Sequence, residues 1–501
     1  MADEGQAAKA REDKDIAALA KGGRTNIFGF LLRLAARLPF LFIAGRIYGP
    51  DVLGRFAYAI LVVEFAAQLA TLGLKRGLAG ALAQTKRPEN HVLADALVLT
   101  LLFSVAAAAV LMLVPQAMFP NSGIHGMDRL LPLIIIAVAG SDVALAACAW
   151  RYDIAATVRA RAIIEPWTIS VAAWLLSYYS LRDGLILSYV LSMIAALAAS
   201  LVPMVRHFGM PRGWRPNPMR LWRMTRINMP LAAADAVEWG SRRLDLAILG
   251  LFVSPAVVGI YYVAQQVASL PQKLKTSFEP ILGPVITRNL KEKNLAAIAR
   301  QVSQVGFWII AAQAGIALAL GIPGEAVMGL VGPQFVDGTL ALGFLLAAEV
   351  VAATAVVSES ALVYLARHRN LMISLAMIAV QAALSFVLIL LARQAGYDDP
   401  IIAAAPALAL ALALASSSVV KSHLLQRLLR CRIATWRPAL IAAALAGVAT
   451  GMLFVALPPH LEWIELMLGV PAILAVYGMV IWRFGFGRED RELFARSRAG
   501  T

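Results

Sequence analysis

Several ionised side chains lie inside long apolar stretches of this sequence, at spacings that could build a binding surface. Four of them follow one another at intervals of three, four and three residues: Asp235, Glu238, Arg242 and Asp245. These intervals place them on one stripe of a helix, with Arg243 about 100° further round. Because an ion is costly in an apolar environment, these groups should face a bundle interior or a wet cavity.

Two more arginines, Arg33 and Arg37, lie four residues apart on one face of the first apolar segment. Arg37 and Arg242 are separated by 205 residues, which is also the offset of the internal repeat described below. Facing arginines would form a cationic site for an anion with phosphate-type oxygens. We predict that Arg37, Arg242, Arg33 and Arg243 bind substrate. The alternatives are a simple Glu238–Arg242 ion pair and, for Arg33, extension of the side chain to lipid headgroups.

Acidic residues in the same segments could bind a coupling ion. Asp142 and Glu349 are 207 residues apart, near the middle of comparable segments. Structural pairing is the alternative for each acid, because buried arginines need counter-ions in any case. The candidates for binding a proton or sodium ion, or for supplying counter-charge, are Asp235, Glu238, Asp245, Asp142, Glu349 and Glu64, with Glu165 and Glu359 as further buried acids.

Membrane-spanning helices must position these residues. Of the 501 residues, 60% are hydrophobic and 15% are charged, whereas soluble domains are about a quarter charged. Apolar runs of about 20 residues, the length that crosses a bilayer as a helix, repeat along the chain. We predict fourteen spans, at roughly 27–47, 53–72, 96–114, 130–150, 162–179, 185–205, 231–252, 256–270, 302–322, 340–364, 372–391, 401–420, 439–457 and 464–482.

The basic residues between the spans determine the predicted orientation. With the N-terminus inside, the inside segments carry 36 of the 45 Lys and Arg residues. Such residues are retained on the cytoplasmic side, so both termini should be cytoplasmic. Basic loops beside anionic lipid headgroups explain the net charge of +15 without a nucleic-acid partner. The outside turns hold only Arg46, Arg55, Arg129, Arg182 and Arg393.

One short phrase occurs twice in the sequence. GPDVLGRF (49–56) and SPAVVGIY (254–261) share a small–Pro–x–Val–aliphatic–Gly–x–aromatic pattern, at the offset of 205. The proline suits the first turn of a helix, and Gly54 or Gly259 permits close approach of a neighbouring helix. Six spans map onto the next six at this offset. Because six is even, both copies run the same way, as in secondary transporters whose halves rock around a site between them.

Three stretches of the sequence resemble bacterial polysaccharide transporters. They are ARLPFLFIAGRIYGPDVLGRFAYAILVVEFAAQLATLGL (36–74), RRLDLAILGLFVSPAVVGIYYVAQQVASLPQKL (242–274) and LVGPQFVDGTLALGFLLAAEVV (330–351). Over roughly 25–485 the chain is similar to the Wzx-type oligosaccharide flippases of the multidrug/oligosaccharidyl-lipid/polysaccharide flippase superfamily. The resemblance implies that undecaprenyl-pyrophosphate-linked oligosaccharide repeat units are flipped across the bacterial inner membrane. A peptidoglycan-precursor lipid flippase and an ion-coupled multidrug exporter of the same superfamily are the alternatives.

The sequence lacks the motifs of an enzyme. It contains no GxxxxGK[ST], GxSxG or HExxH pattern, and its six histidines do not have metal-ligand spacing. Cys148 lies in a span and Cys431 in a cytoplasmic loop, so no disulfide is expected. We predict no catalytic residue, no metal and no cofactor. The outside turns are also too short for a polysaccharide polymerase or glycosyltransferase.

The predicted fold is an all-α integral membrane protein of about 14 transmembrane helices, with two parallel pseudo-symmetric six-helix bundles plus two C-terminal helices. The implied partners are the undecaprenyl-pyrophosphate oligosaccharide lipid, membrane lipids and polysaccharide polymerase machinery. No recognisable motif in the sequence indicates the sugar composition, the coupling ion or the choice between O-antigen, capsule and exopolysaccharide. The predicted parts are a cytoplasmic tail (1–24), the first bundle (25–205), a basic linker (206–226), the second bundle (227–420), two extra helices (421–484) and a cytoplasmic tail (485–501).

Overall fold

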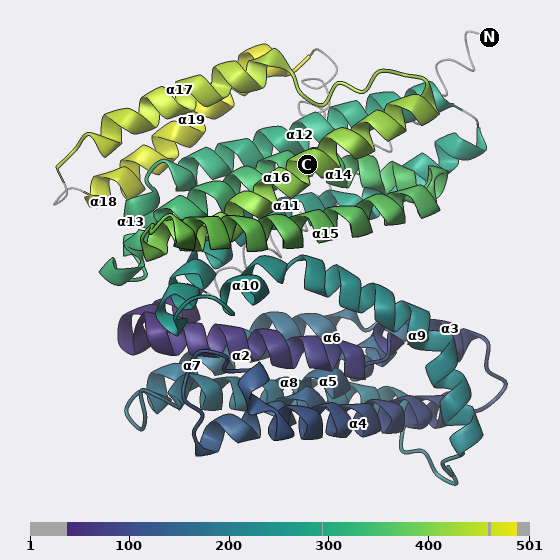
Figure 1. The fold of residues 1–501 in the computed structure, drawn as a ribbon. Helices are drawn as coiled ribbons and strands as arrows, with labels where there is room; N and C mark the ends of the chain where they lie inside the picture. The colour runs from purple at the N-terminus through teal and green to yellow at the C-terminus, as the bar shows by residue number, and fades with distance from the viewer. Residues whose placement is uncertain (1–37, 293, 459–461, 488–501) are drawn as a thin grey trace. The chain divides into compact units, whose positions relative to one another are not determined.

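The computed structural model describes residues 38–292, 294–458 and 462–487, and the regular structure in this part of the chain is entirely helical (Figure 1). Arg33, Arg37 and most of the predicted first span lie outside the described residues. The all-α membrane fold predicted from the sequence is confirmed. Ten helical segments are long and apolar enough to cross a membrane: Leu38–Ala83, Glu89–Leu113, Gly126–Trp150, Gly184–Phe208, Leu295–Gly321, Pro333–Leu365, Arg367–Gln394, Asp399–Leu429, Pro438–Val455 and Glu465–Gly485.

The described part of the chain divides into two compact units, and the first contains residues 38–262. Three of its helical segments are short π- or 3₁₀-type turns that lead into longer helices. The elements of this unit are η1 (Ala44–Tyr48), α2 (Gly49–Ala70), α3 (Leu74–Ala83), α4 (Glu89–Leu113), η2 (Pro115–Ala117), η3 (Gly126–Leu133), α5 (Ile134–Trp150), α6 (Ile154–Val158), η4 (Arg159–Ile164), α7 (Glu165–Leu176), α8 (Gly184–Phe208), α9 (Pro218–Ser241), α10 (Leu244–Leu249) and the beginning of α11 (Pro255–Lys291).

The second unit contains the rest of α11 and the helices that follow it. The helices α14 and α16 pack against each other along their length. The remaining elements are α12 (Leu295–Gly321), α13 (Gly324–Gly329), η5 (Pro333–Gly338), α14 (Thr339–Leu365), α15 (Arg367–Gln394), α16 (Asp399–Leu429), α17 (Pro438–Val455), α18 (Glu462–Ile464), η7 (Glu465–Gly469), α19 (Val470–Val480) and η8 (Ile481–Gly485).

Some predicted spans differ from these ten segments for identifiable reasons. Residues 38–47 of the first predicted span and the whole of the second fall within the single segment Leu38–Ala83. The predicted span 162–179 is divided between η4 and α7, and α7 has only 12 residues. The predicted span 231–252 is interrupted, because α9 ends at Ser241 and α10 begins at Leu244. The predicted span 256–270 is the beginning of α11, which has 37 residues.

The order of elements repeats at the predicted offset. Adding 205 to the residue numbers of α4 gives 294–318, which nearly coincides with α12 at Leu295–Gly321. A 3₁₀ turn precedes the helix in both η3–α5 and η5–α14. The offset is larger for the last pair of helices. Adding 205 to the residue numbers of α8 gives 389–413, whereas α16 occupies Asp399–Leu429. The repeat is therefore visible in the order and positions of the helices. The predicted domain boundaries were based on this repeat and stay predictions.

The two copies of the repeated phrase pack against each other inside the first unit. A Cβ atom on Gly54 would overlap the carbonyl oxygen of Pro255 and lie 2.6 Å from the backbone nitrogen of Gly259. Reciprocally, a Cβ atom on Gly259 would overlap the carbonyl oxygen of Pro50. The backbones of α2 and α11 therefore cross in direct contact. Only glycine leaves room for this crossing, as in close helix pairs of other membrane proteins.

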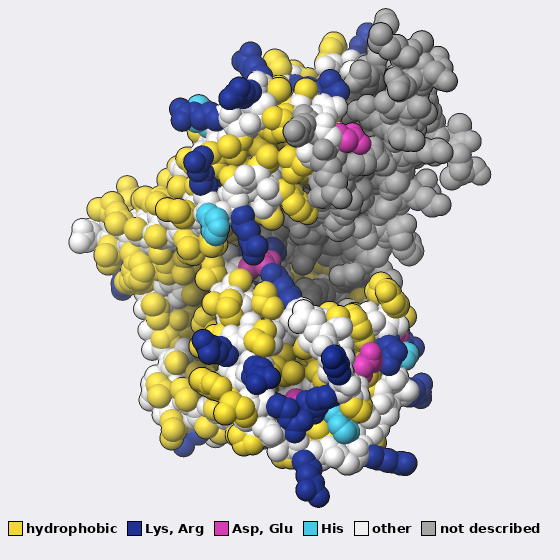
Figure 2. Space-filling view, turned by 90° about the vertical axis from the view of Figure 1, so that its right-hand side faces the viewer, with side chains coloured by type: hydrophobic (Ala, Val, Ile, Leu, Met, Phe, Trp, Pro, Cys, Tyr) yellow, Lys and Arg dark blue, Asp and Glu magenta, His cyan; other side chains and the backbone are white. Residues whose placement is uncertain are grey.

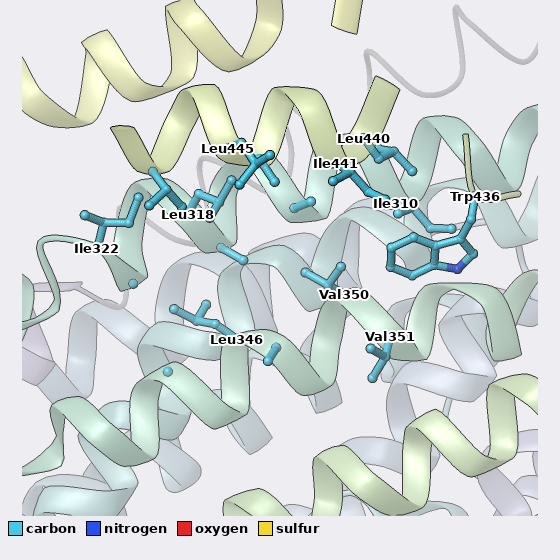
Figure 3. Close-up of a pocket in the computed structure, with 17 residues that line it drawn as sticks. Ile310, Leu318, Ile322, Leu346, Val350, Val351, Trp436, Leu440, Ile441 and Leu445 are labelled. Carbon is cyan, nitrogen blue, oxygen red and sulfur yellow. The ribbon is translucent and has the colours of Figure 1, made fainter. Parts of the chain in front are cut away.

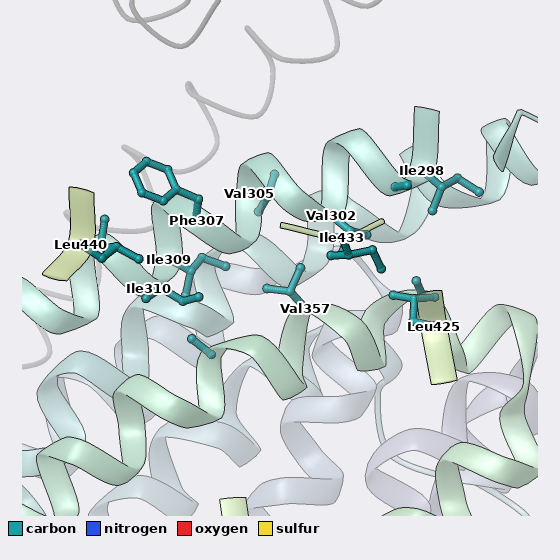
Figure 4. Close-up of a cluster of buried hydrophobic side chains, with 14 of the residues drawn as sticks. Ile298, Val302, Val305, Phe307, Ile309, Ile310, Val357, Leu425, Ile433 and Leu440 are labelled. Atoms are coloured by element: carbon teal, nitrogen blue, oxygen red, sulfur yellow. The ribbon is translucent and has the colours of Figure 1, made fainter. Parts of the chain in front are cut away.

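Each unit has its own apolar interior, and hydrophobic side chains also cover much of the surface (Figure 2). In the second unit, an apolar cavity of about 530 Å³ lies among α12, α14 and α17 (Figure 3). The Trp436 indole at its edge donates to Thr354 Oγ1 at 3.0 Å. Beside the cavity, Phe307 and Val357 belong to the buried cluster that joins α12, α14 and α16 (Figure 4). An exposed apolar surface around packed helices is what a lipid environment requires.

Candidate functional site

Ten ionised side chains of the first unit form three groups of ion pairs, which are together called the network. Five are basic and five are acidic, so this group is balanced in charge. They come from α2, α3, α5, η4, α7 and α9 and from the turn that follows α9. The basic members are Lys75, Arg76, Arg161, Arg242 and Arg243, and the acidic members are Glu64, Asp142, Glu165, Asp235 and Glu238.

Close packing of α3 on α9 brings the first part of this network together. The chain turns at Gly73, which has a φ of +67° and whose added Cβ would lie 2.6 Å from the Ala232 nitrogen. One turn later, a Cβ on Gly77 would overlap the Asn228 side chain. A positive φ and a close approach both favour glycine. The two glycines thus let the side chain of Arg76, between them, reach the acids of α9.

Arg76 bridges two acids that are one turn apart. Its Nε lies 3.0 Å from Asp235 Oδ1, and its Nη2 lies 2.6 Å from Glu238 Oε2. Arg242 Nη2 contacts the other oxygen of Glu238 at 3.2 Å. Asp235 is buried, whereas Arg76, Glu238 and Arg242 are about half-exposed. This part of the network therefore presents charged groups to a bound molecule while it buries one carboxylate.

A second part of the network is centred on Arg161. Its guanidinium contacts Asp142, lies 2.9 Å from Glu165 Oε2 and donates to Ser141 Oγ at 2.7 Å. Arg161 lies in the π-helical segment η4, a type of distortion that is frequent at functional sites. Lys75 Nζ approaches Asp142 Oδ2 at 3.8 Å. Asp142 thus has one close cation and one distant cation.

The third part contains aromatic side chains. The Tyr189 hydroxyl donates to Glu64 Oε1 at 3.1 Å, and Arg243 Nη2 lies 3.4 Å from Glu64 Oε2. The Arg243 guanidinium also lies 5.0 Å from the Trp239 ring centroid, within the range of a cation–π contact. Trp239 in turn packs against Phe65, with ring centroids 5.5 Å apart. An aromatic pair therefore borders the ion pairs.

The structure places the predicted site residues as follows. The Glu238–Arg242 ion pair, which was the alternative reading of that spacing, is present. Asp245 departs from the predicted stripe, because the helix breaks before it and its Oδ2 accepts from the Tyr261 hydroxyl at 2.6 Å. Asp235, Asp142, Glu64 and Arg243 belong to the network, and Glu349 is buried on α14 of the second unit. The substrate-binding role of these residues stays a prediction.

Sequence reasoning assigned Lys75 and Arg76 to a cytoplasmic loop and did not connect Arg161 with any acid. One feature of the sequence could have indicated that Lys75 and Arg76 lie against another helix. They lie between Gly73 and Gly77, and such closely spaced small residues permit tight packing of a neighbouring helix. The second unit holds a smaller cluster of the same type, in which Lys421 Nζ lies 2.9 Å from Glu359 Oε2 and 3.0 Å from Ser374 Oγ.

The sequence matches one family model, described as polysaccharide biosynthesis protein, over residues 43–318. This range is more than half of the 501 residues. The chain belongs to this family. A comparison with curated proteins finds no match.

Solved structures share the fold of this polysaccharide biosynthesis family member. A lipid II flippase MurJ in an inward closed conformation has a TM-score of 0.65 and 10% identity, over 91% of this chain and 99% of that chain. An inward-facing MATE multidrug resistance transporter has a TM-score of 0.61 and 13% identity, over 80% and 98%. A transporter of the same MOP superfamily from Pyrococcus furiosus has a TM-score of 0.52 and 14% identity, over 83% and 96%. At these identities the likeness establishes the fold alone.

Proposed function

We propose that this family member flips undecaprenyl-pyrophosphate-linked oligosaccharide repeat units across the bacterial inner membrane by alternating access. The observation that carries the proposal is the set of ion pairs between membrane helices and the helical segments packed against them in a polysaccharide biosynthesis protein. Ionised groups in such helices are expensive and commonly mark the path of a polar substrate. The product would be O-antigen, capsule or exopolysaccharide, and polysaccharide polymerase machinery would receive it.

The half-exposed cations of the network are suited to a diphosphate. Lys75, Arg76 and Arg242 are each about half-exposed, so their donors are available without unfolding the unit. Guanidinium groups bind phosphate oxygens in a planar, often two-point arrangement. The predicted contribution of Arg33 and Arg37 would add positive charge to a group that is otherwise balanced.

The apolar cavity of the second unit is suited to the lipid part of the same substrate. Aliphatic side chains such as Leu318, Leu346 and Leu445 line most of it. A polyprenyl chain offers only hydrocarbon, so such a lining can accommodate it without leaving a polar group unpaired. A substrate with a diphosphate head and a hydrocarbon tail would therefore find matching chemistry in this chain.

Deletion of the gene in its native strain tests the proposal. Surface polysaccharide should fall, and undecaprenyl-linked repeat units should accumulate on the cytoplasmic side. Complementation with wild type should restore export, whereas the Arg37→Ala/Arg242→Ala variant should not. A charge-assisted hydrogen bond contributes about 1.5–3 kcal/mol, which corresponds to roughly 10–100-fold in substrate affinity for each lost contact.

Arg242 is the cleaner single substitution, because its partner Glu238 is half-exposed and can be hydrated when the arginine is removed. Arg182→Ala, in the exposed turn before α8, is the matched control and should restore export fully. Normal surface polysaccharide and a normal lipid-linked pool in the deletion strain, with no related flippase compensating, would refute the proposal. Sensitivity to drugs, or a loss of lipid II translocation, would then favour the multidrug exporter or the peptidoglycan-precursor flippase.

A further inference from the structure

The loop between α8 and α9 is fastened to the first turns of α4. His91 Nε2 lies 3.0 Å from the carbonyl oxygen of Arg212. The Trp214 indole donates to Oδ1 of the buried Asp95 at 2.8 Å, which fixes the loop against the interior of the unit. The helix α4 begins here and α8 ends here, and both belong to the described segments that are apolar enough to cross a membrane. The loop and the beginning of α9 therefore lie at the level of lipid headgroups.

This region carries positive charge that the protein does not neutralise. Residues 206–226 contain six arginines and no acidic residue. The acids on α4 are already paired, because Asp95 Oδ2 contacts Arg87 at 2.8 Å and Glu89 contacts Arg151 at 2.6 Å. No described acid lies within ion-pair distance of any of the six arginines. Figure 2 shows Lys and Arg side chains gathered on the face of the first unit where α3 and the beginning of α9 lie.

The outward face of α9 alternates arginines with bulky apolar side chains. The buried Thr225 and Asn228 mark the face of the helix that packs against the unit. The exposed residues of the opposite face are Met219, Trp222, Arg223, Arg226 and Ile227. Its three apolar members are each about two-thirds exposed. A helix face that combines arginine with tryptophan and isoleucine suits the boundary between lipid headgroups and acyl chains.

We propose that the outward face of α9 binds an anionic phospholipid, with Arg223 and Arg226 on the headgroup phosphate and Trp222 and Ile227 beside the acyl chains. Guanidinium groups donate charge-assisted hydrogen bonds to phosphate oxygens. A free phosphate ion would match the arginines but would leave the exposed apolar side chains in water. With the predicted orientation, the lipid belongs to the cytoplasmic leaflet, where anionic headgroups attract basic segments.

This lipid site is separate from the ion-pair network and does not depend on the proposed function. Asp235, the first residue of the network on α9, lies nine residues beyond Arg226. Binding can be measured on the purified protein without any oligosaccharide, so a failed flippase assay would leave the lipid site untouched.

The test uses the full-length protein in a neutral detergent and counts bound lipids by native mass spectrometry as dioleoylphosphatidylglycerol is added. Each basic residue at an anionic lipid surface contributes about fivefold in affinity, so Arg223→Gln/Arg226→Gln should weaken binding of the tightest phosphatidylglycerol by roughly 30-fold. High salt should weaken it as well. Dioleoylphosphatidylcholine, which has the same acyl chains and no net charge, should bind weakly and respond to neither change.

Two further double variants separate a defined site from net charge and from misfolding. Lys86→Gln/Arg159→Gln removes the same charge from exposed residues outside the loop and α9, and should leave the affinity within about twofold of wild type. Arg223→Lys/Arg226→Lys keeps the charge and should retain most of the affinity. Equal losses in the two Gln double variants, or a Lys variant as weak as Arg223→Gln/Arg226→Gln, would overturn the proposal.

Trp222 reports on the acyl chains of the bound lipid. In nanodiscs of phosphatidylglycerol and phosphatidylcholine, bromine can be placed on the acyl chains of either lipid. Brominated phosphatidylglycerol should quench tryptophan fluorescence more than brominated phosphatidylcholine at the same mole fraction, and Trp222→Phe should reduce this difference. If Trp222→Phe leaves the difference unchanged, no lipid site exists at α9. An acidic protein segment would then be the partner that fits the arginines.

Discussion

Gly54 lies where two helices of the first unit touch through their backbones, so a single methyl group there should be destabilising. In Gly54→Ala, the new Cβ would meet the carbonyl oxygen of Pro255 and the nitrogen of Gly259. Both are main-chain atoms, so neither can rotate away as the end of a side chain could. The helices α2 and α11 would have to separate, and the contacts around the crossing would loosen.

The expected magnitude combines two opposing effects. Overpacking of a tightly packed site costs about 1–3 kcal/mol. Alanine is better than glycine in the middle of a helix by roughly 0.5–1 kcal/mol, which offsets part of that cost. We therefore expect Gly54→Ala to lower the free energy of unfolding by about 1–2 kcal/mol. At about 2–4 °C per kcal/mol for a unit of this size, the melting temperature should fall by several degrees.

The two cysteines of the chain provide the assay. Cys148 is fully buried in α5 of the same unit, and Cys431 is partly buried in the other unit. In a Cys431→Ser background, a thiol-reactive dye reports unfolding of the first unit through Cys148 alone. The matched control is Gly80→Ala in α3, where an added Cβ meets nothing within 4 Å. This control should raise the melting temperature slightly or leave it unchanged.

The double variant Gly54→Ala/Gly259→Ala tests whether the two glycines act through the same backbone contact between α2 and α11. Once Gly54→Ala has separated the helices, Gly259→Ala should add less than it does alone, so the two free-energy changes should fall short of additivity by at least about 0.5 kcal/mol. If Gly54→Ala is as stable as Gly80→Ala, or if the two glycine substitutions are simply additive, the backbone crossing is not what requires these glycines.

Two further predictions concern buried ion pairs. Arg161→Ala leaves Asp142 and Glu165 without their close cation and should destabilise the first unit by about 3–5 kcal/mol, measured by the same dye. In the second unit, Glu359→Ala should destabilise more than Lys421→Ala, because Lys421 is 5% exposed and Glu359 is 41% exposed. Without its partner, the half-exposed glutamate can be hydrated, whereas the buried lysine keeps an uncompensated charge away from water. Equal losses, followed through Cys431 in a Cys148→Ser background, would contradict this reasoning.

Local patterns in the sequence were sufficient for the fold. The length of the apolar runs predicts the helices, and the phrase around Gly54 and Gly259 predicts the repeat, because both depend on neighbouring residues. The Glu238–Arg242 pair was foreseeable for the same reason, since residues four apart meet on a helix. A close helix contact at the two glycines was also expected, although the pattern did not identify each glycine as the partner of the other.

Pairings between distant residues could not be predicted in this way. Arg76 meets Asp235 across 159 positions of the chain, through a turn at Gly73 that directs α3 onto α9. The hydropathy of the segment assigned Arg76 to a loop. The interruption after Ser241 was equally hidden, because the spacing of the charged residues on both sides of it fits one continuous helix. Single-sequence periodicity carries no information about which helix faces which.

The charged character of α9 has a consequence for how the protein enters the membrane. This helix is not among the ten described segments that are apolar enough to cross on their own. An aspartate or arginine at the centre of a helix opposes insertion by about 2.5–3.5 kcal/mol. Arg76, which pairs with both Asp235 and Glu238, lies on α3, which the ribosome synthesises well before α9. Insertion of α9 should therefore depend on α3 still being held beside the translocon, so that the membrane receives ion pairs rather than isolated charges.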